Sequence, residues 1–323
     1  MRNLILTIIA FFPLACISQI GNYNTFPSLP PLHLLDDVDL LQDISFAYSM
    51  RLLESDYEGP LVRLRRASDN AERDFFCNQE DKVNVLEIDN WRNGSNVFVT
   101  TWYDQSGQNR NAVQTNTNRQ PIFFTDSSFP HFAGDGSNDS LIVQGTFNDV
   151  VENGKNATIT GVFFAIDRAD SAFGAINPSN STNDRWLTHI NWSDEHFYFD
   201  PGYCCNTPRR FRNDVPTSNN GPGKLNTWGQ YTVIRRDDPA NTATDRVIIK
   251  LDGDLKVNGG FPDNRAFTRT DFPFLIGALS RDNLGRPAGA ATTKFAEMIM
   301  YNKGKSDSFV LEIEENQITF WEL

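Results

Sequence analysis

Aromatic and acidic side chains are the groups of this 323-residue chain that could do chemistry. The rings of Trp192, Tyr203, Tyr198 and Trp186 could stack on the apolar face of a sugar, although in a chain this rich in aromatic residues most rings are expected in the core. The four His and four Cys residues form neither a Cys-x-x-Cys pair nor a His-Glu-x-x-His motif. A Gly-x-Ser-x-Gly nucleophile motif is also absent. These absences disfavour a zinc centre and a serine hydrolase of that type.

Three acidic positions have competing interpretations. Asp104 directly follows an expected strand and either contacts a substrate or closes a turn, and the turn is favoured because Asp and Gly dominate such turns. The segment 134–139 is rich in oxygen ligands, so a structural calcium ion is an alternative there. The segment lacks the residue spacing of a calcium-binding loop. No other cofactor is expected. Glu297 lies in an apolar run and is expected to face solvent rather than to pair with Asp282.

Charge and the first residues limit the partners and the compartment. The net charge of −12 argues against sequence-independent nucleic-acid binding, which needs a basic surface. Arg2 precedes an apolar run over 4–14, which is too short to span a bilayer and is typical of a secretory signal. We expect residues 1–18 to be a signal peptide of a secreted, cell-surface or periplasmic protein. The alternative is a lipid anchor through Cys16.

The order of expected elements favours an all-β protein. Prolines make residues 19–42 an extended lead-in. A helix is expected over 43–53 with Asp43 as its N-cap, and a second short helix over 83–91. Strands are expected over 61–65, 97–103, 141–143, 158–166, 186–190, 196–200, 230–235, 246–251, 272–276 and 295–301, and a helix over 308–321. No linker divides residues 43–323, which predict one two-sheet β-sandwich, or jelly roll, with a short N-terminal helical segment and a C-terminal helix.

Two sequence blocks resemble a known enzyme family. The first runs from Ala47 to Leu53, through 59–70, to the Tyr-Asp-Gln-Ser-Gly motif at 103–107; the second comprises 275–283 and 295–301. Together they resemble the catalytic domain of arabinofuranosidase B enzymes, and the second block is equally similar to concanavalin A-like and laminin-G-like jelly rolls. The resemblance extends over about residues 43–323 and is strongest over 47–120. It implies a β-sandwich that hydrolyses terminal α-L-arabinofuranosides with retention.

The resemblance assigns roles to individual residues. Retention requires two carboxylates about 5–5.5 Å apart. Asp282, followed by Asn283, matches the family's acid/base. Asp200 matches the Asp of the family's Asp-x-Glu motif, but the nucleophile position falls on Gly202. Asp200 itself or Glu195 is left as a source of the second carboxylate.

An adjacent cysteine pair also resembles the family. The family places a vicinal disulfide against the sugar, and Cys204-Cys205 is the matching pair, although it follows Asp200 here whereas the family's pair precedes the equivalent Asp. Two alternatives to a vicinal disulfide are that Cys204 and Cys205 are separate thiols, or that one of them forms a disulfide with Cys77. The expected substrate-binding residues are thus Cys204, Cys205, Asn283, Tyr203, Trp192 and Asp104.

The sequence supports two functions of different classes. The first is a secreted glycoside hydrolase of α-L-arabinofuranosidase type that acts on polysaccharide side chains. The alternative is a non-catalytic glycan-binding or adhesion module on the same scaffold, because the expected nucleophile is missing. In both cases we expect a monomer with a polysaccharide or glycan partner and no membrane span.

Overall fold

Antiparallel strands make up most of the regular secondary structure of the described residues, as the sequence predicts. The computed structural model describes residues 33–166, 171–180, 184–194, 196–203, 210–212, 225–237, 245–261, 266–268 and 271–323. Its strands are β1 (Ile44–Ser49), β2 (Val62–Arg66), β3 (Glu72–Phe75), β4 (Val97–Trp102), β5 (Ala112–Val113), β6 (Ile122–Phe124), β7 (His131–Ala133), β8 (Leu141–Val143), β9 (Ala157–Phe164), β10 (Phe173–Ile176), β11 (Arg185–His189), β12 (Tyr198–Pro201), β13 (Phe211–Arg212), β14 (Trp228–Asp237), β15 (Asp245–Leu251), β16 (Asp254–Phe261), β17 (Leu275–Ile276), β18 (Leu279–Ser280), β19 (Pro287–Ala288) and β20 (Lys294–Tyr301).

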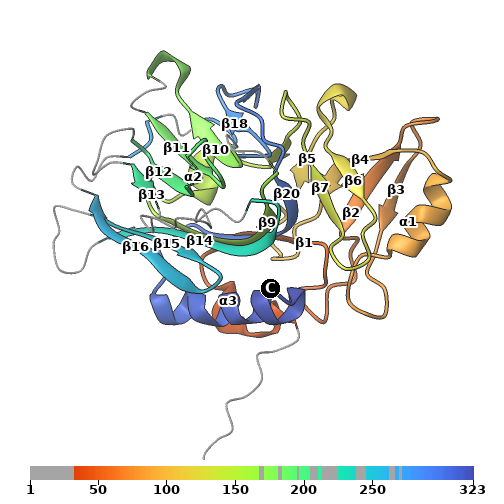
Figure 1. The fold of residues 1–323 in the computed structure, drawn as a ribbon, viewed down its shortest axis with the longest axis horizontal. Coiled ribbons are helices and arrows are strands. Elements are labelled where there is room, and N and C mark those ends of the chain that lie inside the picture. The colour runs from red at the N-terminus through yellow and green to blue at the C-terminus, as the bar shows by residue number, and fades with distance from the viewer. Residues whose placement is uncertain are drawn as a thin grey trace, which may run out of the picture.

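The strands pair in two long series. One series runs β16–β15–β14–β9–β20–β1. The other runs β13–β12–β11–β10–β17–β8–β5–β4–β2–β3, and β6 and β7 join β4 to β20. In Figure 1 the strands β10–β13 lie above β14–β16, and the C-terminal helix lies below that sheet. This layered arrangement confirms the expected β-sandwich.

The helices are short except at the C-terminus. They are α1 (Val85–Arg92), α2 (Phe147–Val150) and α3 (Asp307–Trp321), with 3₁₀ turns at Leu34–Asp36, Val38–Leu41, Thr117–Arg119 and Pro178–Asn180. The side chain of Asn84 caps α1 by accepting a hydrogen bond from the Glu87 amide, and Asn93 ends that helix in the left-handed region. Ser306 caps α3 in the same way. The structure therefore confirms the second predicted helix and the C-terminal helix.

The helix predicted over 43–53 is wrong, because this segment forms strand β1. All six residues of β1 are buried, and its two faces pack into different clusters. Phe46 and Tyr48 contact the main core, whereas Ile44 and Ala47 pack with Tyr301 and Ile313 of β20 and α3. A strand buried on both faces has no alternating polar pattern, so its sequence resembles that of a buried helix. The N-terminal helical segment is instead the pair of 3₁₀ turns upstream.

Glu297 of β20 does not face solvent as predicted but is fully buried. Arg51 donates to both of its oxygens, with Nε 2.6 Å from Oε2 and Nη2 3.0 Å from Oε1. Ser49, Gln317 and Trp321 also donate to this carboxylate, so β1, β20 and α3 meet at one group. Burial alone would raise the pKa of Glu297, but the Arg51 charge and these hydrogen bonds lower it.

Candidate functional site

A second buried carboxylate, Asp200, lies on β12 and is the centre of the candidate site. Its side chain is fully buried. Arg185 Nε lies 3.1 Å from Oδ2, and Arg210 Nε lies 3.1 Å from Oδ1. Burial raises the pKa of Asp200 to about 6, against the opposing effect of the two guanidinium groups. Desolvation therefore outweighs the two ion pairs.

Strand register places Asp200 on the face of β12 that points away from the aromatic core. Asp200 is paired with Leu187 of β11, and Tyr198 with His189. The alternate residues Trp186 and Phe199 pack in the core, where their rings meet edge to face at 5.1 Å. Because side chains alternate along a strand, Asp200, Tyr198 and His189 share the opposite face. We call this the outer face of β10–β12.

Aromatic rings and charged groups meet on this outer face. The Arg210 guanidinium lies 4.3 Å from the centre of the Tyr198 ring and 5.4 Å from that of Trp192. The His189 ring is 4.2 Å from the Trp192 ring. Tyr198 donates its hydroxyl hydrogen to Asp194 at 2.7 Å. Hydrogen-bonding groups beside aromatic rings can orient a polyhydroxylated ligand.

Asp282 is held in a tight turn after β18. Its Oδ1 accepts hydrogen bonds from the Leu284 and Arg286 amides, each at 3.0 Å, and its carboxylate pairs with the Arg286 side chain. Burial opposes ionisation here, but the bonds from Arg286 and Leu284 lower the pKa of Asp282. This carboxyl group is therefore favoured as an anion, which does not suit a general acid.

Strand order separates Asp200 from the strand that precedes Asp282. Strands β12, β11, β10 and β18 are neighbours in that order. Three strand spacings amount to about 14 Å between the backbone at Asp200 and the strand that precedes Asp282. A retaining pair needs its carboxylates about 5–5.5 Å apart. Gly202, at the expected nucleophile position, donates its amide hydrogen to the Arg185 carbonyl at 2.8 Å and has no side chain to contribute.

Asp104 organises a loop in another part of the molecule. It accepts hydrogen bonds from the Ala47 amide at 2.9 Å, from the Ser106 hydroxyl at 2.7 Å and from the Arg110 amide at 2.9 Å. These contacts support the favoured interpretation as a turn residue. The strands β4 and β5 beside this loop lie on the opposite side of Figure 1 from β11 and β12.

The remaining predicted residues divide into two groups. Trp192 lies on the outer face, Asn283 follows Asp282 in its turn, and Tyr203 packs against the core as a partly buried ring. Glu195, Cys204, Cys205 and residues 1–32, which include the expected signal peptide and Cys16, lie outside the described residues. Their predicted roles stay predictions.

Sequence reasoning missed Arg185 and Arg210. A usable signal was present for Arg185, because it alternates with Leu187 and His189 and so shares their face. Arg210 has no such signal, because it reaches Asp200 only through the tertiary fold. In the described part of the chain, no group of three or more His, Cys, Asp or Glu residues could hold a metal ion. No helix among these residues is long and apolar enough to cross a membrane.

Comparison with known proteins agrees with this architecture. Residues 44–152 match the family model described as "Alpha-L-arabinofuranosidase B, catalytic". A solved arabinofuranosidase in complex with arabinofuranosyl-α-1,2-xylobiose superposes with a TM-score of 0.61 and 13% identity, over 86% of this chain and 62% of that one. A GH54 α-L-arabinofuranosidase soaked with a cyclic sulfate inhibitor gives a TM-score of 0.55 and 12% identity, over 86% and 63%.

The chain thus spans a little less than two thirds of the length of these solved arabinofuranosidases. No curated protein matches it. The resemblance to the arabinofuranosidase B catalytic domain is therefore confirmed over residues 44–152, and most of the chain shares the fold of the solved arabinofuranosidases.

Proposed function

We propose that this chain is a carbohydrate-active protein whose outer face of β10–β12 binds a terminal furanosyl group of a polysaccharide. The observation that carries the proposal is the Asp200 cluster. A fully buried carboxylate with a raised pKa, two arginines and the rings of Tyr198 and Trp192 lie together on a face that the core does not use. Polar groups buried at such cost are concentrated at functional sites. The family match supplies the class of ligand.

The proposal explains why the arginines surround Asp200. Arg185 and Arg210 are each only about one-fifth exposed, so they cover the carboxylate from two sides. Guanidinium groups offer donors in a fixed planar array, which suits hydroxyl recognition. The ring of Trp192 beside them supplies the apolar contact that one face of a sugar needs.

Calorimetric titration with arabinofuranosyl-α-1,2-xylobiose tests the site. We expect Trp192→Ala to weaken binding at least tenfold, because the platform is lost, and Asp200→Asn to weaken it as well, because both arginines lose their anchor. Asp254→Asn, on exposed β16, is the matched control and should bind like the wild-type protein. Equal affinity in all four proteins, or no binding by the wild-type protein, would contradict the proposal.

Hydrolysis is the second candidate function. It is favoured by the family match and by the pKa of Asp200 near 6, which suits a general acid. The absence of a side chain at Gly202 and the ionised state favoured for Asp282 support binding without hydrolysis instead. Release of nitrophenol from nitrophenyl α-L-arabinofuranoside between pH 4 and 8 distinguishes the two. If the wild-type protein releases nitrophenol and Asp282→Asn abolishes this release, the result would support Asp282 as the acid/base.

We further propose that the protein is exported and acts as a single domain over residues 43–323. The apolar run after Arg2 supports cleavage after residue 18, and the acidic composition favours a glycan over a nucleic acid as partner. In an oxidising compartment Cys204 and Cys205 can form the vicinal disulfide. The rival location is a lipid anchor through Cys16, and the expected state is a monomer.

A further inference from the structure

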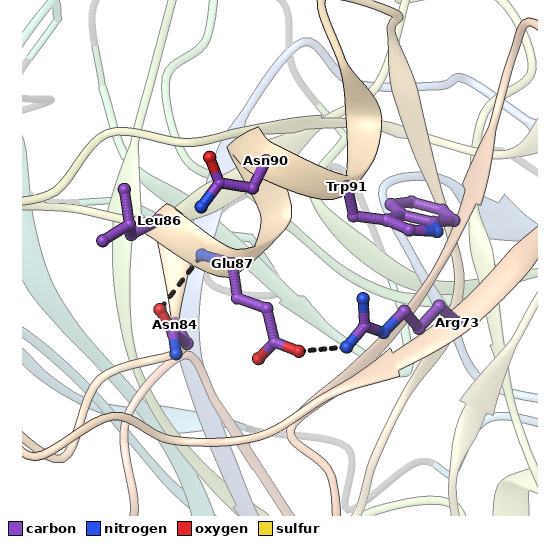
Figure 2. A pocket seen from close by; sticks show the side chains of 6 residues that line it. All are labelled: Arg73, Asn84, Leu86, Glu87, Asn90 and Trp91. Carbon is purple, nitrogen blue, oxygen red and sulfur yellow. Dashed lines mark hydrogen bonds and ion pairs between the residues drawn. The ribbon is translucent and has the colours of Figure 1, made fainter.

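A hollow beside helix α1 has no role in the site described above. It has a volume of about 410 Å³ and is lined by Arg73 of β3 and by Asn84, Leu86, Glu87, Asn90 and Trp91 of α1 and its cap. Figure 2 shows these side chains around one opening, with Trp91 and Arg73 on one side and Leu86 and Asn84 on the other. We call it the α1 groove.

Trp91 is fixed from behind. The Arg66 guanidinium lies 4.9 Å from the centre of its ring, and the same side chain donates to the Trp91 carbonyl. The Phe75 ring meets the indole edge-on at 5.3 Å. The rest of the indole surface lines the groove. Because the ring is already fixed by these contacts, a ligand that stacks on it pays a lower entropic cost.

The polar groups of the groove form a neutral set. Arg73 and Glu87 make an ion pair across it, which Figure 2 marks as a dashed line. The Asn84 oxygen already accepts the Glu87 amide hydrogen at 3.1 Å, so its NH₂ group is the part left for a ligand. The exposed side chain of Asn90 offers both a donor and an acceptor. Paired donors and acceptors beside a ring match the hydroxyls and apolar face of a neutral sugar.

A second hollow continues the first. It has a volume of about 690 Å³, shares Asn84 and Leu86 with the α1 groove, and is otherwise lined by residues 77–80, which include Asn78 and Gln79. Leu86, at the boundary, is 70% exposed, so it offers an apolar surface to a ligand that spans both hollows. Two adjoining hollows fit several linked sugar units better than a single one.

We propose that the α1 groove is a second glycan-binding site, which holds a neutral polysaccharide chain by stacking on Trp91. The class of ligand rests on the proposed function, but the site does not require hydrolysis or the Asp200 cluster. A polyanion fits less well, because the described side chains of both hollows carry one cation, Arg73, against Glu87 and Glu80, on a chain of net charge −12.

Gel electrophoresis in the presence of soluble arabinoxylan tests the site, with polygalacturonate as the anionic comparison. We expect Trp91→Ala to weaken arabinoxylan binding about tenfold. Because Trp91 also packs on Phe75, its loss could unfold the region. Asn90→Ala and Leu86→Ser change exposed side chains and should weaken binding several-fold in folded protein. Leu255→Ser, on an exposed leucine of β16, is the matched control and should bind normally.

The experiment separates this site from the outer face of β10–β12. Asp200→Asn should reduce binding of the short trisaccharide while polysaccharide binding that depends on Asn90 and Leu86 persists. If the wild-type protein binds no trisaccharide but its arabinoxylan binding falls in the groove variants, the proposed function fails and the α1 groove stands. The groove proposal is overturned if the groove variants bind arabinoxylan like the Leu255 control, or if polygalacturonate binds more tightly than arabinoxylan.

Discussion

Glu297 and Asp200 are both fully buried carboxylates with arginine partners, yet their pKa values shift in opposite directions. Glu297 accepts hydrogen bonds from Arg51, Ser49, Gln317 and Trp321, and its pKa is lowered. Asp200 lies 3.1 Å from two arginine Nε atoms, but among the described residues neither of its oxygens accepts a hydrogen bond. Its pKa is raised to about 6.

The difference teaches that hydrogen bonds to the charged form, rather than charge partners alone, decide the cost of a buried carboxylate. At Glu297 of β20 the donors come from β1, from Arg51 just after it and from α3, so the group joins these elements and serves the fold. At Asp200 the cost of burial is only partly offset. A group kept at such a cost is a candidate for function rather than for stability.

The largest expected effect is that of Glu297→Gln. The change leaves the Arg51 guanidinium buried without its anion, and breaking such a pair from one side costs about 3–5 kcal/mol. Urea unfolding measures the loss directly. Glu315→Gln, on the exposed side of α3, is the control and should change stability by less than about 0.5 kcal/mol. A loss at Glu297 as small as in this control would remove it as the group that joins β1, β20 and α3.

The pH dependence of stability should have opposite signs at the two carboxylates. The folded pKa of Asp200, about 6, lies above the ordinary value of 3.8, so its contribution is present below pH 3.8 and is lost as the pH rises through 6. The change is on the order of 3 kcal/mol, at about 1.4 kcal/mol for each pKa unit. Glu297 has a lowered pKa, so its contribution is present above pH 4.5 and is lost as the pH falls through its folded pKa.

Asp200→Asn isolates the first of these effects, because asparagine cannot ionise. The variant should gain stability relative to the wild-type protein between pH 4 and pH 7. Urea unfolding of both proteins at several pH values measures the gap. A gap that stays constant over this range would mean that Asp200 ionises in the fold as it does in water, and the contrast with Glu297 would then disappear.

The sequence predicted the strands with clear local signals better than it predicted contacts between distant segments. The turn closed by Asp104 and helix α1, which was expected over 83–91, depend largely on neighbouring residues, and both follow from residue type. Strand β1 was mistaken for a helix because both of its faces are buried. Glu297 was mistaken for a surface group because Arg51 and Trp321, which enclose it, lie far from it in sequence. Arg210 was missed for the same reason, because its ion pair with Asp200 forms only in the folded chain.

The smallest expected effect concerns Asp282, which differs from both buried groups because its partner is exposed. The Arg286 side chain is about half exposed, so Arg286→Ala should cost less than about 1 kcal/mol of stability. The Asp282 carboxyl group keeps its amide donors but loses the guanidinium, so its pKa should rise toward the ordinary value. A carboxyl NMR titration of both proteins measures this shift. A large loss of stability would place Asp282 with Glu297 as a structural group. A raised pKa in a fully stable protein would show that the Arg286 side chain helps to keep the pKa of Asp282 low, and that a ligand which displaces this side chain would make the carboxyl group a better proton donor.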